Sequence, residues 1–197
     1  MTVATAVSLR DGREILIRPI QATDKELLAR GFERLSAESR YRRFLTPMAR
    51  LSPRMLRYLT EVDHHDHEAL VAESAEGSEP VGVARYIRHA NDPEAAEVAV
   101  AVVDDWQGNG AGTALLRHLA ARAADEGVER FTATCLATNT DVLELFEDVA
   151  PTRVVNTDSG LAEVEVELST REERPLLAAL RRAASGALAF RSPMERG

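Results

Sequence analysis

Short runs of alternating apolar and polar residues recur along the chain, and this alternation is typical of β-strands with one buried face. The clearest runs predict strands at residues 14–18, 69–72, 81–87, 99–103 and 131–136. Two further segments, 154–155 and 164–168, flank Asp158-Ser159-Gly160, and this arrangement predicts a hairpin.

Apolar positions at helical spacing lie between these strands and predict helices at residues 23–35, 36–44, 52–62, 113–126, 140–148 and 172–190. Some of the helix ends carry local signals. Thr23 and Glu26 form a capping-box pattern at the first start. Ser52-Pro53 supplies an N-cap with proline at the first helical position, and Gly127 marks a helix end.

The order of these elements predicts an α+β fold with a mixed, mostly antiparallel sheet flanked by helices. The helix at 113–126 joins its two neighbouring strands as one parallel β-α-β crossover. We expect a single domain over residues 1–170 and a C-terminal helical tail over residues 171–197. The tail could pack on the domain, extend into solvent or pair with a second copy, so a homodimer stays open.

Composition narrows the class of protein. The formal net charge of −8 over 197 residues argues against a nucleic-acid binder, which would normally present a basic surface. Cys135 is the only cysteine, so we expect neither a disulfide framework nor a thiolate metal site. No apolar run approaches the ~20 residues of a membrane span, and no secretory signal is visible. We therefore expect a cytoplasmic protein.

A glycine-rich turn, Gln107-Gly108-Asn109-Gly110-Ala111-Gly112, lies between the strand at 99–103 and the helix at 113–126. Glycines leave backbone N–H groups unshielded, and a helix N-terminus favours negative charge, so the turn predicts an anion site. A dinucleotide site would need an acidic residue at the end of the next strand, where this chain has Ala137-Thr138. A P-loop would need Gly-Lys-Ser/Thr, which does not follow.

The turn matches the pattern Q/R-x-x-G-x-G/A at Gln107, Gly110 and Gly112. It resembles the coenzyme A pyrophosphate loop of the Gcn5-related N-acetyltransferases (GNAT), and the resemblance extends over roughly residues 8–170. The resemblance implies a GNAT-like fold, acetyl-CoA as cosubstrate and no metal. It also implies coenzyme contacts from Val102, Val103, Gln107, Gly108, Asn109, Gly110, Ala111, Gly112, Thr113 and Asn139.

Glu97 lies on the strand that leads into the turn, in an otherwise apolar segment. An amine nucleophile must lose a proton before it attacks, so a nearby carboxylate suits a general base. The alternative is a glutamate at an exposed strand start. Phe146 stands where the family commonly has a tyrosine that reprotonates the departing thiolate, so Phe146 cannot take that role. A coenzyme A thiolate is a fair leaving group, so water could suffice. The alternatives are a weakened enzyme or another acid such as Tyr86.

Residues 36–44, 51–53 and 68–72 resemble the acetyltransferase domain of bacterial protein-lysine acetyltransferases. This implies that the acceptor is a protein lysine, for example on an acyl-CoA synthetase, and that Glu97 is the base. Two alternatives stay open: a transferase acting on a small amine, and a catalytically silent module that binds coenzyme A.

Two other groups of residues are candidates for metal or phosphate binding. Asp63-His64-His65-Asp66-His67 contains metal-ligating residue types but no HExxH spacing, so we expect a solvated turn or a rim of the substrate site. Arg40, Arg42 and Arg43 are interpreted as a solvated helix face, although they could also steer the coenzyme phosphates.

Overall fold

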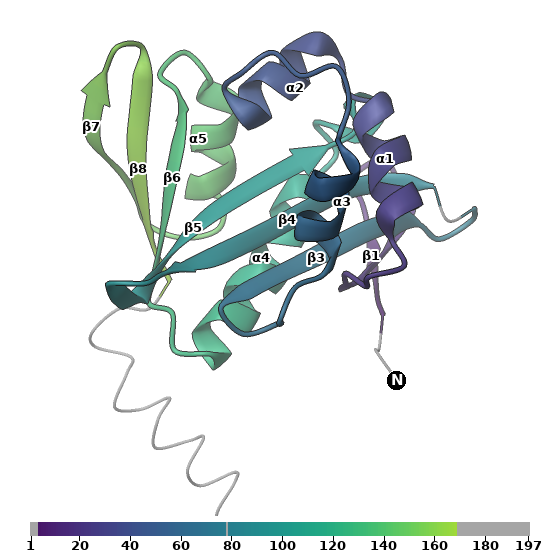
Figure 1. Ribbon diagram of the computed structural model, residues 1–197, viewed down its shortest axis with the longest axis horizontal. Coiled ribbons are helices and arrows are strands. Elements are labelled where there is room, and N and C mark those ends of the chain that lie inside the picture. The colour runs from purple at the N-terminus through teal and green to yellow at the C-terminus, as the bar shows by residue number, and fades with distance from the viewer. Residues whose placement is uncertain (1–3, 78, 169–197) are drawn as a thin grey trace, which may run out of the picture.

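The computed structural model describes residues 4–77 and 79–168, which form one twisted sheet with helices on both faces (Figure 1). The strands lie in the order β1-β2-β3-β4-β5-β6-β8-β7. Neighbouring strands are antiparallel except β5 and β6, which are parallel and are joined through α4. The predicted α+β fold with a single crossover of this kind is therefore confirmed.

The strands are β1 (Thr5–Ser8), β2 (Glu14–Pro19), β3 (His67–Ser74), β4 (Pro80–His89), β5 (Asp92–Val102), β6 (Arg130–Leu136), β7 (Thr152–Asp158) and β8 (Leu161–Glu167). The helices are α1 (Lys25–Glu33), α2 (Ala37–Phe44), α3 (Pro53–Thr60), α4 (Ala111–Asp125) and α5 (Thr140–Glu147), with a short 3-10 turn at Asp104–Trp106.

Strand β3 shows how the core divides between the two faces of the sheet. Successive side chains of a strand point to opposite faces. Leu70 belongs to the larger core cluster, which includes Leu115 and Leu119 of α4. Val71, its neighbour in the chain, packs with Leu27 of α1 in a smaller cluster. Helices α1 and α3 therefore cover one face, and α4 covers the other (Figure 1).

Several local signals in the sequence are confirmed. The Ser52 hydroxyl accepts a hydrogen bond from the Met55 N–H at 3.2 Å, and Pro53 is the first residue of α3. The hairpin between β7 and β8 turns through Ser159 and Gly160, whose φ angles of 51° and 81° are both positive. That geometry matches the two-residue turn that fits the twist of a hairpin.

The capping box predicted at Thr23 is wrong. Helix α1 begins at Lys25, and its N-cap residue Asp24 makes no capping hydrogen bond. The Asp24 carboxylate instead accepts two hydrogen bonds from the Arg18 guanidinium, at 2.7 and 2.9 Å. It also accepts one from the Gln21 N–H at 2.7 Å. A partner six residues away in a neighbouring strand thus outcompetes the local cap.

The start of the sheet also differs from the prediction. A strand absent from the prediction, β1, pairs with β2, so the strand predicted at 14–18 is the second and not the first. The connection turns at Gly12, whose φ is 86°, and Asp11-Gly12 is a known hairpin signal. Strand β5 begins at Asp92 and is longer than the predicted strand.

Two further predictions concern the C-terminal tail and the absence of a membrane span. The predicted helix at 172–190 and the tail at 171–197 lie outside the described residues. Across residues 4–77 and 79–168, none of the helices combines the length and apolar character needed to cross a membrane.

Candidate active site

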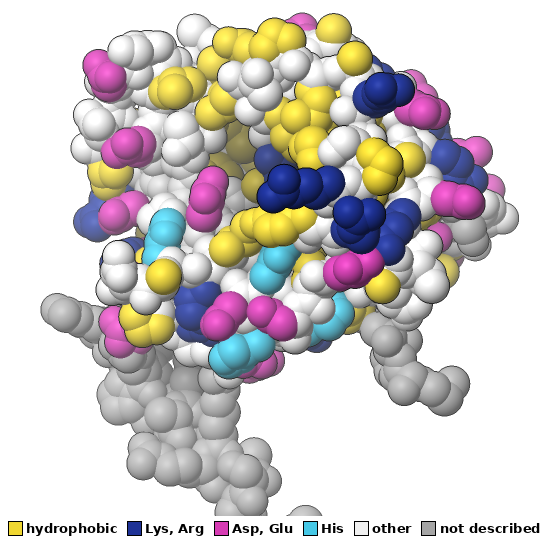
Figure 2. Space-filling model, in the orientation of Figure 1, with side chains coloured by type: hydrophobic (Ala, Val, Ile, Leu, Met, Phe, Trp, Pro, Cys, Tyr) yellow, Lys and Arg dark blue, Asp and Glu magenta, His cyan; other side chains and the backbone are white. Residues whose placement is uncertain are grey.

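A cleft of about 890 Å³ opens where β5 and β6 separate. The two strands pair only at Ala95↔Arg130, Ala96↔Phe131 and Glu97↔Thr132. Beyond Glu97, β5 continues to Val102 without β6 beside it, while its other edge stays paired with β4. One edge of the β5 backbone therefore faces the cleft, and its N–H and C=O groups are available to an extended ligand. The surface is hollowed on the face shown in Figure 2.

The glycine turn forms one end of this cleft. Gly108 and Gly110 have φ angles of 74° and 93°, a region that other residues enter only with strain. Gly110 is the N-cap of α4, and its C=O accepts the first helical bond from Ala114 at 2.9 Å. The N–H groups of the first turn of a helix have no partner inside the helix. The turn thus presents backbone donors and the positive end of a helix dipole toward the cleft.

Gly112 is required for a different reason, because α4 and α5 approach closely there. A Cβ at this position would lie 3.2 Å from Leu145 Cδ2 and 3.6 Å from Val102 Cγ2. Gln107 closes the turn, since its side-chain amide donates to the Val102 C=O at 2.8 Å. Neighbouring residues thus hold the turn against the end of β5.

The structure brings most of the predicted site residues to one cleft. Its lining includes Glu97, Val102, Gln107, Gly108, Gly110, Gly112, Thr113 and Asn139. Asn139 is 8% exposed, and its side chain makes no capping hydrogen bond to α5. Val103, Asn109 and Ala111 are not part of the lining. Val103 donates its N–H to the Val81 C=O at 2.9 Å, and the residue belongs to the larger core cluster.

Glu97 lies at the end of the cleft opposite the glycine turn. Its side chain is exposed and lies opposite Ile87 of β4. The guanidinium of Arg43, on α2, lies within electrostatic reach of it. Burial lowers the pKa of Arg43, and the charge of Glu97 opposes that effect. A carboxylate and a guanidinium thus share this end of the cleft.

Phe146 has no acidic group that could donate a proton. Its ring is buried and lines the cleft. Tyr86 is not part of the cleft lining, and its hydroxyl donates to the His65 C=O at 3.0 Å. Burial, the larger effect, and the charge of Glu68 raise the pKa of Tyr86 to about 12. Cys135 is buried, and burial raises the pKa of its thiol.

The arginines of α2 do not form the solvated helix face that the sequence predicts. Arg42 and Arg43 line the cleft, and Arg42 pairs with Asp141 of α5 at 2.9 Å. Arg40 donates to the C=O of Phe32 at 3.2 Å and stacks on its ring. A sequence signal was present, because Arg40, Arg43 and Phe44 share one face of the helix at i, i+3 and i+4 spacing.

The histidine-rich segment lies at the start of β3, where each ring has a protein partner. His64 bonds to Glu68 at 2.8 Å, His65 to Glu126 at 2.6 Å and His67 to Arg85 at 3.1 Å. In the described ranges, no group of three or more His, Cys, Asp or Glu side chains is arranged to hold a metal ion. The segment is also absent from the cleft lining.

The site therefore combines a strand that separates from its parallel neighbour with a glycine turn and a helix N-terminus at the end of that strand. Comparison with known proteins identifies the family that this site belongs to. The model of the acetyltransferase (GNAT) family matches residues 28–149. The chain belongs to this family. Membership agrees with the resemblance seen in the sequence, and it makes the protein an N-acetyltransferase.

Individual relatives extend this match. The chain is 35% identical over 140 residues to acetyltransferase PA5475 of Pseudomonas aeruginosa, covering 70% of this chain and 75% of the relative. It is 32% identical over 162 residues to acetyltransferase Pat of Mycolicibacterium smegmatis, covering 82% of this chain but only 48% of the relative. The GNAT domain of S. lividans PAT superposes with a TM-score of 0.78 at 34% identity, covering 83% of this chain and 96% of that domain.

Proposed function

We propose that this protein transfers an acetyl group from acetyl-CoA to the side-chain amine of a protein lysine, with Glu97 as general base. One observation carries the proposal. The cleft between β5 and β6 has a glycine turn and a helix N-terminus at one end and an ionisable carboxylate at the other, and β5 connects the two.

The residues of the cleft fit coenzyme A. Its pyrophosphate suits the N–H groups of Gly110 to Thr113, with Arg10 and Arg42 nearby as counter-charges. The pantetheine arm is an extended chain with amide groups, so it suits the unpaired edge of β5 up to Val102. Asn139 offers a side-chain amide from the opposite wall. Acetyl-CoA supplies the activated acetyl thioester, and the polypeptide supplies position and proton transfer.

Glu97 is suited to take the proton from the acceptor. A lysine amine has an ordinary pKa of about 10.4, so at neutral pH it arrives as an ammonium and cannot attack. The exposed Glu97 carboxylate attracts that cation and accepts its proton, directly or through one water. A backbone N–H of β5 facing the cleft would polarise the thioester carbonyl. Phe146 offers no proton to the departing thiolate, and a thiolate with a pKa near 8.5 leaves without one.

A protein lysine is favoured by two features. Residues 36–44, 51–53 and 68–72 resemble bacterial protein-lysine acetyltransferases, whose acceptors include acyl-CoA synthetases. Glu97 is also exposed, so a side chain that projects from a folded protein can reach it. Helix α2 borders the same cleft through Arg42, Arg43 and Phe44.

Release of free coenzyme A thiol, measured with and without a lysine acceptor, tests the proposal. We expect amine-dependent release by the wild type and a loss of about 100-fold or more in kcat for Glu97→Gln, the usual contribution of a general base. Acetyl-CoA binding should persist in that variant. Glu94→Gln removes the same charge from the same strand outside the cleft and serves as the control.

Two results would contradict the proposal. Equal turnover by Glu97→Gln and the wild type would remove Glu97 as base. No thiol release with protein, peptide or small amine, despite measurable acetyl-CoA binding, would favour the silent coenzyme-binding module.

A further inference from the structure

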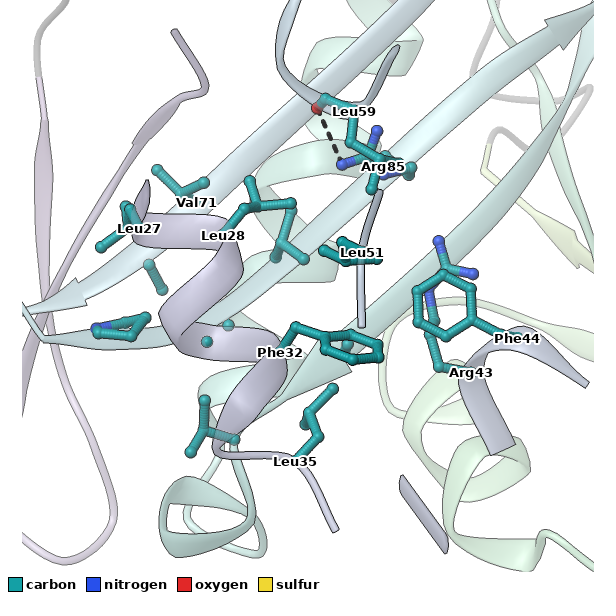
Figure 3. A pocket seen from close by; sticks show the side chains of 17 residues that line it. Leu27, Leu28, Phe32, Leu35, Arg43, Phe44, Leu51, Leu59, Val71 and Arg85 are labelled. Carbon is teal, nitrogen blue, oxygen red and sulfur yellow. Dashed lines mark hydrogen bonds between the residues drawn. The ribbon is translucent and has the colours of Figure 1, made fainter. Parts of the chain in front are cut away.

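A second cavity, of about 60 Å³, adjoins the cleft on the face covered by α1, α2 and α3 (Figure 3). Its walls are mostly apolar and include Leu27 and Phe32 of α1 and Val71 of β3. A set of residues lines both the cavity and the cleft: Leu35, Arg43, Phe44 and Ala101. The cavity is therefore a side chamber of the cleft. One water needs about 10–15 Å³ of such volume, so the chamber has room for a small polar group and its neighbouring methylene.

Two guanidinium groups enter this apolar chamber. Arg43 comes from α2 and lies along the Phe44 ring, and Arg85 comes from β4 (Figure 3). Arg85 is only 4% exposed. It donates to the Leu59 C=O and to His67 Nε2, each at 3.1 Å. Both partners are uncharged, because burial lowers the pKa of His67 to about 4 and keeps its ring neutral at pH 7.

These charges lack a counter-ion of their own. Among the described residues, neither guanidinium has a carboxylate at salt-bridge distance, and Glu97 acts on Arg43 only at longer range. Burial, the larger effect, and the nearby charge of Arg43 together lower the pKa of Arg85 to about 9. A buried cation such as Arg85 is costly to hold beside a second positive charge without an anion. An anion placed between them would remove that cost.

The register of the sheet places this charge pair at a short distance from the proposed base. Arg85 pairs with Ala99 of β5, and Ala99 is two residues from Glu97. Two residues span about 7 Å along an antiparallel strand, and alternate residues share a face. The distance from an amine bound at Glu97 to the chamber is therefore about the length of one lysine side chain.

We propose that Arg43 and Arg85 bind a carboxylate carried by the acceptor, and so select amines that have an acid group at a lysine-like spacing. The inference rests on the proposed acetyl transfer. The carboxylate has two sources with the same chemistry: an acidic residue beside the target lysine in a protein, or the acceptor's own carboxylate in a free amino acid. Arg is suited to either, because its planar fork binds a carboxylate through two parallel hydrogen bonds.

Matched acceptors test the inference through thiol release. Nα-acetyl-lysine is compared with Nα-acetyl-lysine amide, and a capped Asp-Lys peptide with its Asn-Lys counterpart. For the wild type we expect kcat/KM to be at least about tenfold higher for the carboxylate member of one pair, mainly through KM, as expected for one charge-assisted hydrogen bond. The pair that shows the preference identifies the source of the carboxylate.

Variants then assign the preference to the chamber. In Arg43→Gln the ratio of kcat/KM values should fall to about one, and Arg43→Lys should give an intermediate ratio. Arg54→Gln removes an exposed charge from α3 and should keep the wild-type ratio. Because a ratio is compared, a general loss of activity or of folded protein does not mimic the result.

The outcomes separate this inference from the function on which it rests. Thiol release with a wild-type ratio of one in both pairs overturns the inference and leaves acetyl transfer intact. Absence of release with every acceptor overturns acetyl transfer itself. A preference for succinyl-CoA over acetyl-CoA that Arg43→Gln abolishes, with no preference between acceptors, would assign the chamber to the acyl chain and also overturn the inference.

Discussion

Replacing Gly112 with alanine tests whether the first turn of α4 must lack a side chain to receive the coenzyme. Alanine is favoured over glycine inside a helix by about 0.8–1.0 kcal/mol. Its Cβ, however, would lie 3.2 and 3.3 Å from the two δ carbons of Leu145. Leu145 lines the cleft, so it can yield only by rotating, at a cost of about 0.5–1.5 kcal/mol. The two contributions nearly cancel.

We therefore expect Gly112→Ala to keep its thermal midpoint within about 2–4 °C of the wild type, the shift that 1 kcal/mol causes in a chain of this size. Acetyl-CoA affinity should fall about tenfold or more, since the displaced Leu145 intrudes beside the N–H groups that bind phosphate. Trp106 is the only tryptophan, is 6% exposed and lies just before the turn, so its fluorescence reports binding.

Gly127→Ala is the matched control at the other end of α4. Gly127 has a φ of 83° and no atom within 4 Å of a built Cβ, so alanine there meets only backbone strain. That strain is worth about 1–2 kcal/mol. We expect the control to lose stability and to keep its affinity, the reverse of Gly112→Ala. If Gly112→Ala binds acetyl-CoA as tightly as the wild type, the interpretation of the turn as the coenzyme site is refuted.

Two further predictions concern stability. Gly82→Ala would place a Cβ 2.8 Å from the Ala101 C=O and 3.0 Å from Leu115, so we expect a loss of about 1–3 kcal/mol in urea unfolding; an unchanged midpoint would contradict the packing of α4 on β4. Burial, aided by the charge of Arg85, lowers the pKa of His67 from 6.5 to about 4. The unfolded chain therefore binds this proton first, and stability falls as the pH drops from about 6.5 to about 4. His67→Gln should show a shallower fall across this range, and an identical pH profile would argue against a buried neutral ring.

Features that depend on neighbouring residues could be predicted from the sequence. The glycine turn, the Ser52 cap and the Ser159-Gly160 hairpin each require particular backbone geometry within a few positions. The parallel crossover also followed, because a strand, a helix and a strand of suitable lengths join in few ways. These elements fix the cleft, so the residues at its two ends could be named before the structure was known.

Features that depend on distant partners could not be predicted. Thr23 and Glu26 formed a credible capping box, but the Arg18 guanidinium engages Asp24 and sets the entry to α1. The sequence of α2 alone predicts a solvated Arg43, and only the placement of α2 over the open end of the sheet brings it into the cleft and the chamber. The separation of β5 from β6 is likewise tertiary, since nothing local in either strand indicates that pairing stops after Glu97.

The most direct test of the account is a crystal structure with a conjugate that joins coenzyme A to a lysine amine through an acetyl bridge. The account predicts pyrophosphate oxygens within hydrogen-bond distance of N–H groups of residues 110–113 and the pantetheine along the free edge of β5. It predicts the lysine nitrogen within reach of the Glu97 carboxylate, directly or through one water. A conjugate bound outside the β5–β6 cleft, or with its lysine nitrogen beyond one water of Glu97, would contradict it.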